Sequence, residues 1–166
     1  MLDISAIDLL SPQTVTSSVQ LYEIDFHAWT QQQSRLIRDG HWAEVDRTNL
    51  LEEIESLGRQ QRQELRSRLG ILIGHLLKWH YQPQRRSQSW LTTLRLQRIE
   101  IVDLLNDNPS LNPYLEEAID RAYLRGLTIA VEETKLSNEL FPIDCEYTLA
   151  EMLNDDFYPG ENSDLL

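Results

Sequence analysis

Cysteine, glycine and proline are all scarce in this chain. The single cysteine among 166 residues, Cys145, excludes an internal disulfide and fits a reducing compartment such as the cytoplasm. Six glycines and six prolines are few for this length, whereas Leu, Glu, Arg and Gln are frequent. This composition favours a helical protein over a sheet of short strands and tight turns.

Long apolar runs are also missing. None approaches the roughly 18 residues that a membrane-spanning helix needs. The first ten residues, MLDISAIDLL, contain two Asp and no Lys or Arg, unlike the basic start of a secretory signal peptide. We therefore expect a cytoplasmic protein that makes no membrane contact.

Positive charge is in short supply, because 15 Lys and Arg face 27 Asp and Glu, for a net charge of −12. An acidic protein of this kind does not bind DNA, RNA or anionic lipid over its whole surface. Residues 59–99 are the exception, with nine basic side chains and one acidic one. The acidic segments on either side can offset this charge within the molecule or across a dimer.

Apolar residues recur at three- and four-residue steps and predict an all-α fold. We expect a helical bundle of about four main helices with a short C-terminal helix. Asp25, Asp46 and Asn112 are candidate N-terminal caps, and Gly40 is a candidate left-handed helix end. The expected helices cover 26–39, 48–82, 88–107 and 114–137, and the short one lies within 141–156. The second is either continuous or kinked, since its stripe is polar over 58–63.

The same patterns suggest a division of the chain and one helix contact. We expect an N-terminal arm over 1–20, a single helical domain over 21–160 and a polar tail over 161–166. In the fourth predicted helix, small residues recur every four positions and allow another helix to approach closely. We expect the apolar stripe from Leu65 to Trp79 to face this line, which consists of Ala118, Ala122, Gly126 and Ala130.

Several segments together resemble a known family. The run NLLEEIESLGR is followed by ILIGHLLKW, and later by RSQSWLTTLRLQRIEI, LNDNPSL and FPIDCEYT. Between about Tyr22 and Gly160, the chain resembles the bacterial, largely cyanobacterial family called "domain of unknown function 29". The resemblance implies a compact helical domain from a bacterium. It implies no activity and supplies no catalytic residues.

Metal ligands and nucleophiles are weakly represented. The Glu-x-x-His spacing of di-iron bundles does not occur. A metal-dependent enzyme would have to combine His75 or His80 with Glu53 or Glu55, although a solvated helix face also explains the acidic residues. Acidic neighbours disfavour a thiolate at Cys145. We name no catalytic residue, favour no metal site, predict no cofactor and lean toward a protein without catalysis.

The stretch HLLKWHYQPQRRSQSW, residues 75–90, mixes basic and aromatic side chains, as nucleic-acid-binding segments do. Two interpretations remain. The stretch is an internal and partner-facing element of an interaction or regulatory protein, which binds another protein or itself. Alternatively, the segment 59–98 binds nucleic acid or phosphate. The candidate residues of such a basic patch are Arg66, Lys78, Arg85, Arg86 and Arg95.

Overall fold

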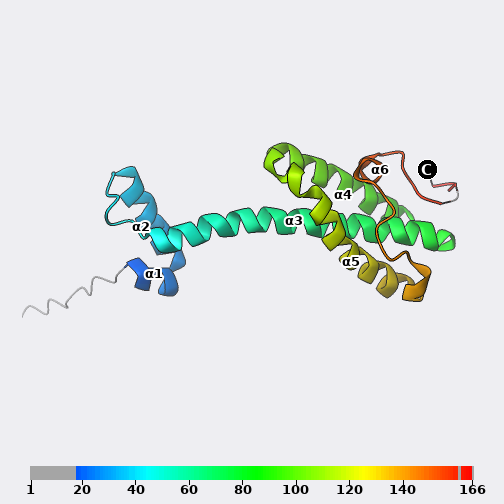
Figure 1. Cartoon of the computed structure of the whole chain (residues 1–166), viewed down its shortest axis with the longest axis horizontal. Helices are drawn as coiled ribbons and strands as arrows, with labels where there is room; N and C mark the ends of the chain where they lie inside the picture. The colour runs from blue at the N-terminus through cyan, green and yellow to red at the C-terminus, as the bar shows by residue number, and fades with distance from the viewer. Residues whose placement is uncertain (1–17, 161, 166) are drawn as a thin grey trace, which may run out of the picture. The chain divides into compact units, whose positions relative to one another are not determined.

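The computed structural model describes residues 18–160 and 162–165, and these contain helices and connecting segments but no strand (Figure 1). The predicted all-α fold is therefore confirmed. Contacts divide the chain into two compact units, one up to Ser56 and one from Leu57 onward. The proposed arm falls mainly on residues 1–17, outside the described part, and the division into arm, domain and tail stays a prediction.

The N-terminal unit contains α1 (Ser18–Ile24), α2 (Phe26–Arg38) and the beginning of α3 (Arg47–Tyr81). The predicted cap is confirmed, since the Asp25 carboxylate accepts a hydrogen bond from the Ala28 amide at 2.9 Å. Gly40 adopts the expected left-handed conformation, with φ of 77°. Helix α1 was not predicted, because its sequence SVQLYEI carries too little periodicity.

Asp46 organises the start of α3. Its carboxylate accepts hydrogen bonds from the Asn49 amide and from the Trp29 indole, both at 3.3 Å. Its own amide donates to the side-chain oxygen of Gln33 at 2.8 Å. Gln33 interrupts the apolar stripe of α2, and this bond provides a partner for the oxygen of its buried side-chain amide.

The second unit contains the remainder of α3, then α4 (Gln88–Asp107), α5 (Leu115–Thr134) and α6 (Leu149–Leu153). Three 3₁₀ helices, Pro83–Arg85, Pro109–Tyr114 and Asn138–Leu140, lie in the connections. Helix α3 runs without a break from Arg47 to Tyr81, over the range 48–82 for which the sequence left one continuous and one kinked alternative. Its buried side chains include Leu65, Leu69, Leu72, Leu76 and Trp79.

The start and end of α5 correct two details. A 3₁₀ helix runs through Asn112, whose side-chain amide donates to the Pro109 carbonyl at 2.9 Å. Asn112 is therefore not the cap of α5, which begins at Leu115 without a side-chain cap. The helix ends at Thr134 rather than residue 137, because Lys135 takes a left-handed φ of 60°.

Helices α3 and α5 approach each other closely at glycines, which have no side chain to separate the two backbones. A Cβ atom added to Gly126 would lie 2.8 Å from Ile73 Cγ2 and 3.0 Å from the Gly70 carbonyl oxygen. A Cβ on Gly74 would lie 3.0 Å from the Gly126 carbonyl oxygen. The predicted close contact is present at Gly126, and Gly70 and Gly74 lie opposite it on α3.

Arg98 holds the end of α6 and the segment after it against α4. Arg98, buried in α4, donates to the carbonyl oxygens of Met152, Asp155 and Phe157 at 2.8, 3.2 and 2.5 Å. Its guanidinium carbon lies 5.0 Å from the centre of the Tyr158 ring. The guanidinium thus replaces the hydrogen bonds that these carbonyls would otherwise make with water.

Candidate functional site

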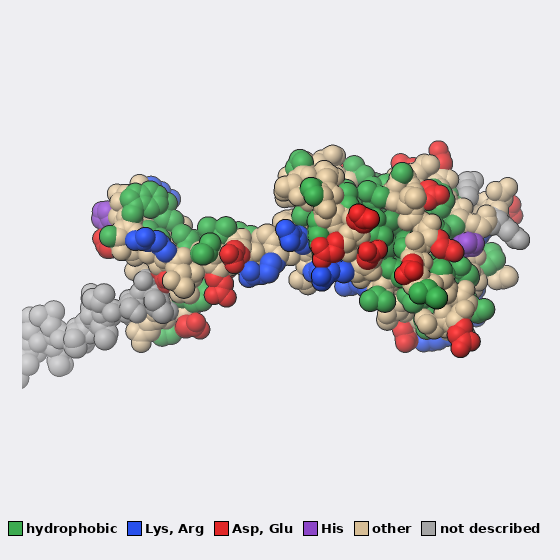
Figure 2. All heavy atoms as spheres, viewed as in Figure 1, with side chains coloured by type: hydrophobic (Ala, Val, Ile, Leu, Met, Phe, Trp, Pro, Cys, Tyr) green, Lys and Arg blue, Asp and Glu red, His purple; other side chains and the backbone are tan. Residues whose placement is uncertain are grey.

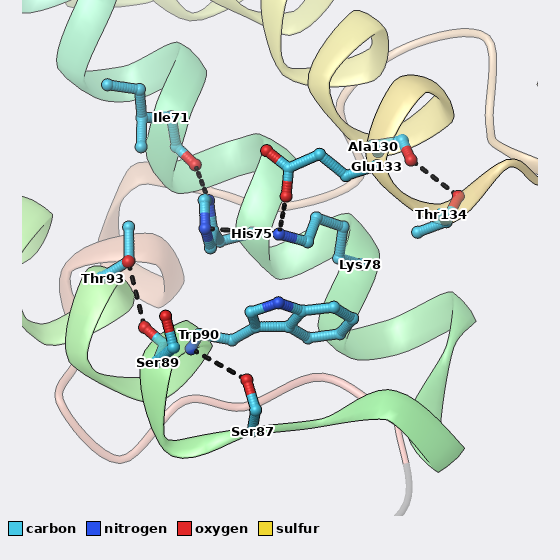
Figure 3. A network of polar contacts seen from close by, with 10 residues as sticks. All are labelled: Ile71, His75, Lys78, Ser87, Ser89, Trp90, Thr93, Ala130, Glu133 and Thr134. Carbon is cyan, nitrogen blue, oxygen red and sulfur yellow. Dashed lines mark hydrogen bonds and ion pairs between the residues drawn. The ribbon is translucent and has the colours of Figure 1, made fainter.

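Lys78 is the centre of a polar network at the end of α3. Its side chain is 1% exposed, and its ammonium pairs with the Glu133 carboxylate of α5. The same ammonium lies 4.3 Å from the centre of the Trp90 ring of α4 (Figure 3). A buried ammonium needs such a carboxylate and aromatic face to offset its loss of hydration.

His75 completes the network in its neutral form. Its Nδ1 lies 3.0 Å from the Ile71 carbonyl oxygen, which only accepts, so Nδ1 carries the proton. Its Nε2 lies 3.4 Å from Lys78 Nζ and accepts from that ammonium (Figure 3). Burial, together with the nearby Lys78 charge, lowers the pKa of His75 below its usual 6.5.

Arg86 and His80 face inward from the same stretch. The Arg86 side chain donates to the Trp79 carbonyl at 2.8 Å and lies over the Trp79 ring, 4.9 Å from its centre. It also reaches the Pro159 carbonyl at 3.4 Å. His80 Nδ1 lies 3.1 Å from the Tyr147 hydroxyl. Much of the aromatic and basic character of 75–90 therefore serves packing within the second unit.

A family model described as "Domain of unknown function DUF29" matches residues 21–158. The chain belongs to this family. No curated protein and no solved structure matches the chain. Membership of the DUF29 family agrees with the resemblance seen in the sequence and assigns no activity, so the function of this DUF29 chain has to be argued from its own residues.

The five basic-patch candidates do not form one exposed surface. Lys78 is enclosed and Arg86 is directed at backbone carbonyls. Arg85 and Arg95 are exposed, and Arg66 lines a cleft formed by α3 and α5. The structure thus separates candidates that the sequence had grouped by proximity along the chain.

The metal-site candidates are engaged by different partners. Glu53 accepts a 2.6 Å hydrogen bond from the Tyr22 hydroxyl, which raises the pKa of Tyr22 to about 12. His75 and His80 take part in the contacts given above, and Glu55 is exposed. Within 18–160 and 162–165, no three His, Cys, Asp or Glu side chains gather as a metal site requires.

Sequence reasoning missed the partner of Lys78. A signal for its burial existed, because GILIGHLLKW is apolar on nearly all sides and predicts a helix enclosed all round. Glu133 could not be identified in the same way. It is one of several acidic residues in α5, and only the relative position of α3 and α5 selects it.

The first part of α3 presents apolar side chains to solvent. Leu51, Ile54 and Leu57 are 58%, 58% and 60% exposed, and we call these three residues the exposed α3 stripe. Hydrophobic side chains are visible at the surface of this part of α3 in Figure 2. No helix within the described residues is long and apolar enough to cross a membrane. An apolar row on a water-exposed helix is typical of an interaction surface.

Proposed function

We propose that this protein is an interaction protein that associates with a second copy of itself through the exposed α3 stripe. The supporting observation is the spacing of Leu51, Ile54 and Leu57, which recur at three-residue steps on a well-formed helix and remain open to water. Two helices that pair along such a row remove it from water, as in a short coiled coil.

We further propose that this role is exercised in the cytoplasm of a bacterium, without catalysis and without a cofactor. The lone Cys145 supports a reducing compartment. Burial raises the pKa of its thiol, so the nucleophilic thiolate is disfavoured. The pairing of Lys78 with Glu133 and Trp90 supports a structural part for that amine.

Sedimentation equilibrium tests the self-association. The natural chain is expected to dimerise, and Leu51→Gln/Ile54→Gln/Leu57→Gln is expected to be monomeric with unchanged circular dichroism. The matched control is Leu96→Gln/Ile99→Gln, which removes exposed apolar residues from α4 and should leave the dimer intact. A monomeric natural chain, or equal loss in both variants, contradicts the proposal.

A further inference from the structure

Three arginines converge on one cleft in the second unit. The cleft has a volume of about 340 Å³ and is formed by α3 and α5. Arg66 comes from α3, and Arg121 and Arg125 come from α5. Gln63 and Ser67 add polar side chains to the lining. This concentration of positive charge lies in a protein whose net charge is −12.

The bare backbone of Gly70 determines where the Arg125 side chain runs. A Cβ atom at Gly70 would lie 2.9 Å from Arg125 Cδ, 3.1 Å from Cγ and 3.2 Å from Cβ. The stem of Arg125 therefore occupies the space that any other residue would fill. Its guanidinium is carried to the cleft, where Nη1 donates to Ser67 Oγ at 3.3 Å.

The arginines of the cleft are only partly neutralised. Arg121 pairs with Glu117 at 2.8 Å on the surface of α5. Arg125 bonds to a neutral hydroxyl, and no hydrogen bond or ion pair joins Arg66 to another described residue. Like charges in one hollow repel each other, and a bound anion would remove that repulsion.

We infer that this cleft binds a phosphoryl group carried by a small molecule. Arginine presents a planar fork of donors that matches phosphate oxygens, and three such forks provide more donors than a single carboxylate accepts. The acidic remainder of the chain repels an extended polyanion such as a nucleic acid. On the rim, Leu124 is largely exposed and offers apolar surface to an organic substituent.

Isothermal titration of the full chain at fixed ionic strength tests the site. The probes are inorganic phosphate, pyrophosphate and phenyl phosphate, so that a free phosphate and a monoester are distinguished. We expect one site, weakened about tenfold or more by Arg66→Gln or Arg125→Gln, since a hydrogen bond to a charged group is lost. Arg95→Gln removes an exposed arginine of α4 and should bind normally.

Gly70→Ala provides a variant that leaves the net charge unchanged. Its methyl group displaces the Arg125 stem, so binding should weaken while general electrostatic attraction stays the same. Circular dichroism and the thermal midpoint of each variant verify folding. The inference is overturned if no probe binds, if sulfate at equal ionic strength binds as well, if Arg66→Gln and Arg95→Gln behave alike, or if a phosphoserine peptide binds much more tightly than every small phosphate.

Discussion

The two halves of α3 carry similar apolar spacing and meet different surroundings. Leu51, Ile54 and Leu57 are exposed, whereas Leu65, Leu69 and Leu72 are completely buried. Both halves have apolar residues at three- and four-residue steps, but only the second contains GILIGHLLKW, which is apolar on nearly all sides. The buried half is the one that α5 approaches, where Gly126 meets Ile73 and the backbone of Gly70 and Gly74. An apolar row without such a counterpart in its own chain is available to another molecule.

The largest expected difference between the halves comes from leucine truncation. Leu72→Ala should lower the free energy of unfolding by about 2–5 kcal/mol, because it leaves a cavity in a closed core. The same change at Leu51 should cost less than about 0.5 kcal/mol in the monomer. Urea unfolding of both variants at low protein concentration measures the contrast. Equal losses would mean that the first half of α3 is also packed.

The second prediction concerns the ion pair between Lys78, in the buried half of α3, and Glu133 of α5. Glu133→Gln removes the carboxylate that faces the enclosed Lys78 ammonium and should cost about 3 kcal/mol. This is the lower end for broken buried pairs, because water reaches Glu133, which is 52% exposed. Glu132→Gln is the matched control, since its pair with Lys135 is exposed and contributes about 0–1 kcal/mol. Chemical denaturation compares them, and similar losses would contradict an enclosed ammonium.

Replacing a glycine by alanine should change the stability in opposite directions beside the two halves of α3. Gly126 of α5 faces the buried half, and Gly58 lies next to the exposed α3 stripe. Gly126→Ala should destabilise by about 1–3 kcal/mol, because its Cβ meets Ile73 and the Gly70 backbone. Gly58→Ala meets nothing within 4 Å and should stabilise α3 by about 0.5–1 kcal/mol. Thermal midpoints should therefore move in opposite directions. A neutral Gly126→Ala variant would show that α3 and α5 are less closely packed.

The smallest expected effect concerns pH. The folded state lowers the pKa of His75 below 6.5, so the unfolded chain binds the proton more readily. The neutral form of His75 therefore contributes stability above pH 6.5, and this contribution declines as the pH falls below that value. Burial and the charge of Lys78 disfavour the imidazolium, while the charge of Glu133 favours it. Urea midpoints at pH 7.5, 6.5 and 5.5 should fall less in His75→Gln than in the natural chain. His27→Gln, an exposed position in α2, should retain the natural slope.

The sequence predicted the features that depend on neighbouring residues. Helix periods, the Asp25 and Asp46 caps and the small-residue line of α5 all follow from spacing within one element. The Asn112 cap was wrong because a 3₁₀ helix took over the turn before α5. The carboxylate partner of Lys78, Glu133, lies 55 positions along the chain, and the arginine cleft joins Arg66 of α3 to Arg121 and Arg125 of α5. Only the packing of α3 against α4 and α5 brings them together.

Arg98 binds the end of α6 and the segment after it through their backbone and makes no hydrogen bond that depends on the side chains there. It binds the carbonyl oxygens of Met152, Asp155 and Phe157, and every amino acid, proline included, possesses that oxygen. Mutations at Asp155 therefore leave the acceptor in place. The amino-acid sequence of this stretch can therefore change while its hydrogen bonds to Arg98 remain. Arg98 itself has no equivalent replacement, because no other side chain offers three separate nitrogen donors in one plane.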